Sequence, residues 1–145
     1  NYVSRSVIQP IAVGDLRQTL DVEPTKILAL SDDIQLMNEI FDHLRRRYSP
    51  SELYLTKSTP TFVEATHPQV SKGAAVRYLA EEYLGMGADQ VMAIGDNLND
   101  LEMIEYAGIG VAMGDAPEAV RQKATWVAPN VEQDGAATAI EAFLL

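Results

Sequence analysis

The sequence has no cysteine, and few positive charges balance its acids. The absence of cysteine excludes disulfides and thiolate metal sites, and it fits a reducing, cytoplasmic location. No apolar run approaches the ~20 residues that span a bilayer, and no signal peptide is visible, so we expect no membrane association. With 11 Lys and Arg against 21 Asp and Glu, the net charge of -10 argues against nucleic acid as a partner.

The hydrophobic fraction of 47% is normal for a globular fold, and 145 residues suffice for one domain or two small pieces. Residues 1–66 predict an α+β unit. Its expected elements are a strand at Lys26–Leu30, a helix at Ile34–Arg47, and two strands at Glu52–Lys57 and Thr61–Thr66. The alternating side chains of the last two strands favour an antiparallel pair.

Residues 67–145 follow a different rhythm, because short apolar strands alternate with helices, which indicates a parallel sheet. We expect helices at Gly73–Leu84, Leu98–Tyr106, Glu118–Ala124 and Gly135–Leu144, and strands at Gln90–Ile94, Ile109–Met113 and Trp126–Ala128. Three parallel strands leave an exposed edge. That edge, with a first residue that is Asn rather than Met, suggests that N-terminal strands have been removed, and it also predicts a homodimer or strand exchange.

The segment Gly95–Asp100, here called the acidic turn, comes directly after the apolar strand that ends at Ile94. Open α/β sheets bind ligands at the carboxyl ends of their strands. The two carboxylates and two amides of the turn suit a hard cation such as Mg²⁺. The alternative is a plain tight turn in which Asp96 or Asn99 caps the next helix.

Lys72 is predicted at the start of a helix, one helix and one strand before the acidic turn. Lysine pairs with phosphate as a compact point charge, and backbone N–H groups at a helix start also favour anions. The alternative is an ordinary exposed surface lysine. A cation site and an anion site at neighbouring strand ends would together form a pocket for phosphate and Mg²⁺.

Four motifs together resemble the haloacid dehalogenase superfamily, most closely its Cof-type sugar-phosphatase branch. They are Val70–Gly73, Ala93–Asp100, Ala107–Gly114 and Asn130–Gly135, in the order and spacing of that family. The resemblance implies a fold class of α/β, a partial Rossmann-like parallel sheet preceded by part of an α+β cap domain. Residues 1–66 would be part of the cap, and residues 67–145 the C-terminal half of the catalytic core.

In that family Mg²⁺ assists transfer of a phosphoryl group to an aspartate, and water then hydrolyses the aspartyl-phosphate. The resemblance implies that Lys72 is catalytic and binds phosphate, and that Asn99 binds phosphoryl oxygens. It implies that Asp96 is a direct Mg²⁺ ligand and that Asp100 supports the metal through water. The implied substrate is a small phosphorylated metabolite, with phosphosugars foremost.

The sequence departs from the family at the nucleophile, because it contains no Asp-x-Asp-Gly motif. The adjacent acids Asp32 and Asp33 are interpreted as a helix cap and a first-turn acid. Asp115 stands where the branch often has asparagine, and it too is interpreted as a helix cap. We therefore expect a fragment of a phosphatase that is inactive alone. The alternatives are a non-catalytic protein that binds a phosphorylated ligand or a partner, and one piece of a split hydrolase.

Overall fold

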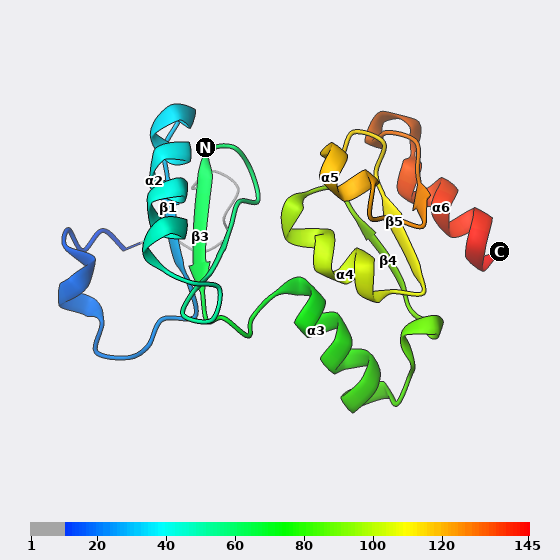
Figure 1. Ribbon diagram of the computed structural model, residues 1–145, viewed down its shortest axis with the longest axis horizontal. Helices are drawn as coiled ribbons and strands as arrows, with labels where there is room; N and C mark the ends of the chain where they lie inside the picture. The colour runs from blue at the N-terminus through cyan, green and yellow to red at the C-terminus, as the bar shows by residue number, and fades with distance from the viewer. Residues whose placement is uncertain (1–10) are drawn as a thin grey trace.

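The computed structural model describes residues 11–145, so the first ten residues of the predicted cap segment lie outside the described residues. The described chain forms two three-stranded sheets, one antiparallel and one parallel (Figure 1). The predicted mixed α/β class with a parallel sheet is thereby confirmed. Among residues 11–145 no helix is both long and apolar enough to cross a bilayer.

The antiparallel sheet has the strand order β1-β3-β2, and β3 pairs with both neighbours. The predicted order of strand, helix, strand and strand is confirmed. The elements of this region are the 3-10 helix η1 (Leu16–Thr19), β1 (Ile27–Leu30), α2 (Ile34–Arg47), β2 (Tyr54–Thr56) and β3 (Phe62–Thr66).

Helix α2 begins where a side chain can cap it. The Asp33 carboxylate accepts a hydrogen bond from the Leu36 N–H at 3.0 Å, and no acid lies in the first turn. The cap is therefore Asp33 and not Asp32, so the prediction of a capping Asp32 followed by a first-turn acid is wrong: both acids precede the helix. Met37 is buried with 1% of its surface exposed and anchors the helix on the sheet, whereas Leu36 is 44% exposed.

The parallel sheet has the order β4-β5-β6, with helices between consecutive strands. The predicted helix Gly73–Leu84 is split, because the chain changes from α- to π-helical geometry and stops at Gly85, whose φ is 67°. The elements are α3 (Lys72–Tyr78), the π-helix η2 (Leu79–Leu84), the 3-10 helix η3 (Ala88–Gln90), β4 (Met92–Gly95), the 3-10 helix η4 (Leu98–Asp100), α4 (Leu101–Tyr106), β5 (Ile109–Ala112), α5 (Glu118–Arg121), β6 (Trp126–Val127), the 3-10 helix η5 (Val131–Gln133) and α6 (Gly135–Leu144).

The central strand β5 is buried on both faces, as a parallel strand should be. Its neighbouring residues Val111 and Ala112 are both fully buried, and they belong to different clusters because successive side chains alternate across a strand. Ala112 packs with residues of α4 and α5, and Val111 packs with Ala139 of α6. Helices α4 and α5 thus cover one face of the sheet and α6 covers the other (Figure 1).

Candidate cation and phosphate site

The acidic turn leaves the carboxyl end of β4, as predicted, and its shape depends on Gly95. A Cβ atom at Gly95 would lie 2.8 Å from the Cγ atom of Asp100, which is too close for any real side chain. The absence of a side chain therefore lets the turn fold back over the Asp100 carboxylate. The turn continues into η4 and then α4, so Asp100 is held between a strand and a helix.

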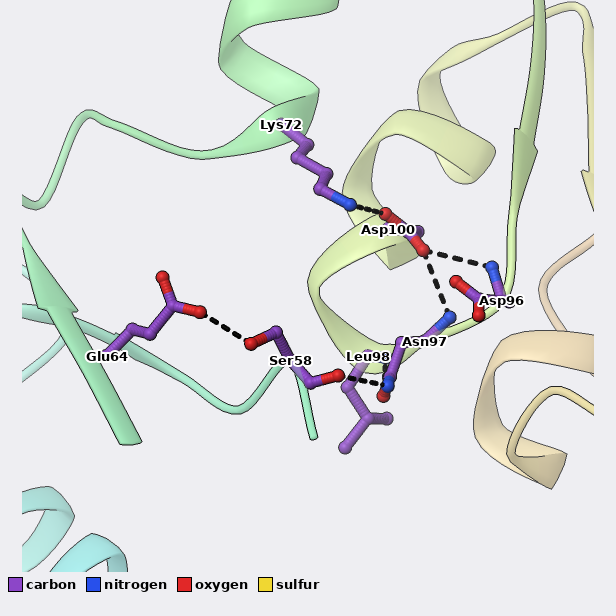
Figure 2. A network of polar contacts seen from close by, with 7 residues as sticks. All are labelled: Ser58, Glu64, Lys72, Asp96, Asn97, Leu98 and Asp100. Carbon is purple, nitrogen blue, oxygen red and sulfur yellow. Dashed lines mark hydrogen bonds and ion pairs between the residues drawn. The ribbon is translucent and has the colours of Figure 1, made fainter. Parts of the chain in front are cut away.

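Asp100 is the buried centre of the site, with 2% of its surface exposed. Its Oδ1 atom accepts from the Lys72 ammonium, and its Oδ2 atom accepts from the N–H groups of Asp96 at 2.9 Å and Asn97 at 3.0 Å (Figure 2). Burial acts to raise the pKa of Asp100, but the ammonium and the two N–H groups outweigh it. The pKa of Asp100 is therefore lowered, and its carboxylate is held in the charged form.

The Asp96 side chain lies beside this carboxylate and is exposed (Figure 2). Partial burial and the neighbouring charge of Asp100 raise the pKa of Asp96, and Lys72 opposes this rise. Two carboxylates in contact repel one another, and a cation placed between them would relieve that repulsion.

The donor chemistry of the turn fits Mg²⁺. This ion prefers hard oxygen ligands, and proteins usually supply one or two carboxylates while water and phosphate supply the rest. Among residues 11–145 no group of three or more His, Cys, Asp or Glu side chains could hold a metal. Within the described part of the chain, the carboxylates available to Mg²⁺ at this turn are therefore those of Asp96 and Asp100.

Lys72 reaches Asp100 because α3 and α4 pack closely. Ser71 caps α3 by accepting a hydrogen bond from the Ala74 N–H at 3.1 Å. A Cβ atom on Gly73 would lie 2.8 Å from the backbone carbon of Glu102, so only glycine permits this approach of the two helices. The Lys72 side chain is 51% exposed, so its ammonium pairs with Asp100 and still faces solvent.

Asn99 lies half-buried in the same turn, and its side chain makes no hydrogen bond with any residue the structure describes. Its amide is therefore available to a ligand. The alternative in which Asp96 or Asn99 caps the next helix is wrong, because the cap of η4 is Asn97. The Asn97 side chain accepts a hydrogen bond from the Leu98 N–H at 2.8 Å.

Asn97 has a second role that sequence patterns did not predict. Its Nδ2 group donates to the backbone carbonyl of Ser58 at 2.7 Å, and the Ser58 hydroxyl donates to Glu64 at 2.6 Å (Figure 2). Asn97 and Ser58 are 39 residues apart. No local pattern connects residues at such a separation, so only the folded chain brings them together.

The prediction for Asp115 is wrong. Pro117 is the N-terminal cap residue of α5, and no side chain caps this helix. Asp115 is exposed two residues earlier. Proline suits a helix start because its fixed φ is already close to helical and the chain there needs no N–H donor, so a capping carboxylate is dispensable.

The fold is a mixed α/β fold with a parallel sheet, and comparison with known proteins shows the family to which it belongs. The family of haloacid dehalogenase-like hydrolases matches residues 9–140. The chain is 39% identical over 114 residues to the 5-amino-6-(5-phospho-D-ribitylamino)uracil phosphatase YcsE of Bacillus subtilis, which covers 79% of this chain and 44% of the relative. It is 31% identical over 143 residues to the corresponding phosphatase YitU of the same organism, covering 92% of this chain and 49% of the relative.

A solved structure of a haloacid dehalogenase-like hydrolase from B. subtilis superimposes with a TM-score of 0.77 at 30% identity, covering 92% of this chain and 46% of that one. The chain belongs to the haloacid dehalogenase-like hydrolases, so the predicted family is confirmed. It spans about half the length of the curated relatives that it matches, 44% and 49% for the two phosphatases.

Proposed function

We propose that this chain supplies the cation- and phosphate-binding half of a Mg²⁺-dependent phosphomonoester hydrolase. The observation that supports this most directly is the contact between Lys72 and the buried Asp100, with the exposed carboxylate of Asp96 at its side. A positive group from α3 beside the negative groups of the acidic turn suits a ligand that carries both phosphate and a divalent cation.

The two acids have different roles in this proposal. Asp96 is the direct ligand, because its carboxylate is exposed and a bound cation would offset the repulsion that raises its pKa. Asp100 already accepts three hydrogen bonds from the protein, so it supports the cation through water. When bound, Mg²⁺ would neutralise charge on the phosphoryl oxygens.

The remaining two side chains bind the phosphoryl group. The Lys72 ammonium, fixed by Asp100 and half exposed, holds a positive charge beside the phosphoryl oxygens. The Asn99 amide, which has no hydrogen-bond partner among residues 11–145, donates a hydrogen bond to one of them. The attacking group lies outside this set, because the sequence has no Asp-x-Asp-Gly motif.

The substrate of the whole protein is a small phosphorylated metabolite. Two relatives are named for the hydrolysis of 5-amino-6-(5-phospho-D-ribitylamino)uracil, a phosphate ester of a sugar-derived chain. This supports phosphosugars and related polyol phosphates as the substrate class. The net charge of -10 would repel large polyanions, which supports a small ligand held at one local cationic group.

Isothermal titration of the chain with Mg²⁺, with and without inorganic phosphate, tests this proposal. We expect Asp96→Asn to weaken Mg²⁺ binding by about tenfold or more, because it removes the charge of the direct ligand. Asp89→Asn is the matched control, since Asp89 is an exposed acid on η3 outside the turn. Equal Mg²⁺ affinity of the wild type and Asp96→Asn would refute the proposed cation site.

Hydrolysis of a generic aryl phosphate with Mg²⁺ separates the catalytic proposal from its alternatives. We expect no turnover by the chain alone, because the family's nucleophile motif is missing from it. Turnover that disappears in Asp96→Ala would contradict that expectation. Activity that appears only when a second chain carrying the motif is added would support a split hydrolase.

A further inference from the structure

We infer that Asn97 is a positioning residue that couples the β2–β3 loop (residues 57–61) to the acidic turn, so that a cation bound at the turn also steadies this loop. The link through Asn97 stands on hydrogen bonds of the described residues. The effect of the cation rests on the proposed function. The two parts are therefore tested separately.

On the loop side, the position of Ser58 is set by Glu64. The Ser58 hydroxyl donates to Glu64 Oε1 at 2.6 Å, and Lys26 donates to Glu64 Oε2 at 2.8 Å (Figure 2 shows the first of these). Glu64 lies on β3, the central strand of the antiparallel sheet, and its side chain is 14% exposed. The loop is thereby attached to the most restrained strand of its region.

On the turn side, Asn97 makes three hydrogen bonds to three different groups. Its Nδ2 donates to the Ser58 carbonyl at 2.7 Å, its Oδ1 accepts from the Leu98 N–H at 2.8 Å, and its backbone N–H donates to Asp100 at 3.0 Å. Because both ends of one planar amide are occupied, the amide cannot follow the loop without leaving Leu98. Any displacement of Ser58 must therefore break a bond or disturb the backbone that holds Asp100.

The coupling to a cation follows from the shared carboxylate. Asp100 accepts the backbone N–H of Asn97, and it lies against Asp96, the proposed direct ligand. A cation that orders this pair of acids also orders the Asn97 backbone, and through its side chain the loop at Ser58. Such coupling is reciprocal: whatever factor the cation contributes to loop stability, the loop contributes to cation affinity.

Amide hydrogen exchange of the metal-free chain tests the link, with two variants of Asn97. Asn97→Ala removes both side-chain bonds. Asn97→Asp has nearly the same shape and keeps the acceptor for Leu98, but it cannot donate to Ser58. We expect both variants to exchange at least about fivefold faster over residues 57–62 and over residues 95–100, because both lose the bond to the Ser58 carbonyl and one lost hydrogen bond corresponds to a factor of about five. Circular dichroism checks that each variant is folded.

Asn38→Ala is the matched control for the metal-free comparison. Asn38 accepts a hydrogen bond from Lys57 at 2.6 Å, so it touches the same loop from α2. Its loss leaves both hydrogen bonds of Ser58 in place, so we expect it to change the exchange of residues 95–100 less than Asn97→Ala does. Unaltered exchange of residues 57–62, or of residues 95–100, in both Asn97 variants would overturn the inference.

A second measurement adds Mg²⁺ alone to the wild type and to Asn97→Ala. We expect Mg²⁺ to slow amide exchange of residues 57–62 in the wild type and not in the variant. We also expect the variant to bind Mg²⁺ more weakly, by the same factor by which Mg²⁺ slows exchange of these residues in the wild type. Equal protection in both proteins would refute the coupling. If the wild type binds no Mg²⁺, the proposed function fails, while the metal-free comparison still decides the role of Asn97.

Discussion

The two regions of the molecule are stabilised in different ways. In the antiparallel region, residues 11–66, Met37 and Val63 are the buried hydrophobic side chains among the described residues, whereas the parallel region contains eleven. The parallel region packs small residues tightly around β5, and several of its glycines leave no room for a Cβ atom. The antiparallel region has fewer buried side chains to hold its elements together, so more of its stability must come from helix caps, turns and strand pairing.

This difference explains where the charged groups of the site are anchored. Asp100 and Lys72 both belong to the parallel region, where dense packing can hold a buried charge and its partner in one arrangement. The antiparallel region contributes a loop, and it reaches the turn through the carbonyl of Ser58. The buried charge is thus supported by the parallel region, and the antiparallel region adds one hydrogen-bonded loop beside it.

The largest effect is expected for Asp100→Ala in the parallel region. The substitution leaves Lys72 and the N–H groups of Asp96 and Asn97 without their buried acceptor. We expect the free energy of unfolding to fall by about 3 kcal/mol, measured by urea denaturation at pH 7. A loss no larger than that caused by Asp89→Asn would mean that Asp100 does not organise this region.

The same carboxylate predicts a pH dependence. Because the pKa of Asp100 is lowered by folding, its stabilising contribution is present above the unfolded pKa of about 4 and is lost as the pH falls through the folded value. We expect acidification below pH 4 to destabilise the wild type more than Asp100→Asn. Parallel stability curves for the two proteins would contradict this assignment.

The next largest effect is expected for Gly110→Ala, which tests the dense packing of the parallel region. A Cβ atom at Gly110 would be driven into the carbonyl oxygen of Ile104, so we expect Gly110→Ala to lower the free energy of unfolding by about 2–3 kcal/mol. Gly87→Ala is the control, because the group nearest to its new Cβ is the flexible carboxylate of Asp89. Similar losses for both variants would show that the close approach at Gly110 is not restrictive.

Met37→Ala tests whether the antiparallel region, with its few buried side chains, unfolds independently of the parallel region. We expect a loss of about 2 kcal/mol, since a buried side chain is replaced by a cavity in a region with little else buried. Hydrogen exchange should then rise in β1 and β3 and stay unchanged in β4 and β5. Equal acceleration in both sheets would show that the two regions unfold as one unit.

Asp96→Asn is expected to have a small effect of opposite sign. The raised pKa of Asp96 means that its charged form is disfavoured in the folded state, so its charge opposes folding at neutral pH. The variant should melt slightly higher than the wild type at pH 7 without metal, and this gain should vanish below about pH 4. A lower melting temperature at pH 7 would contradict the assigned repulsion.

The smallest effect is expected for Arg17→Ala in the antiparallel region. Arg17 pairs with Asp15 at 2.6 Å, but its side chain is 86% exposed, and such pairs add little in water. Differential scanning fluorimetry should detect no shift of the melting temperature. A clear drop would show that exposed ion pairs stabilise this region more than its few buried side chains suggest.

Local patterns predicted much of the fold. The bounds of α2 agree with the structure because apolar residues repeat at helical spacing between a capping acid and three arginines. The parallel strands were recognisable as short apolar runs separated by helices. One error is internal, because the predicted helix Gly73–Leu84 changes to π-helical geometry after Tyr78. The others concern helix ends, where Asp32 and Asp115 were assigned wrongly because several residues near a terminus can cap it and only the backbone geometry selects one.

The family, the class of each region and a candidate site could be read from the amino-acid order, because they depend on local patterns and on motifs of a few residues. That candidate site comprises Lys72, Asp96, Asn99 and Asp100. The contacts of Lys72 with Asp100 and of Asn97 with Ser58 became known from the folded chain alone. These partners lie 28 and 39 residues apart, and helix packing and strand pairing bring them together. No periodicity in the chain encodes contacts of that separation.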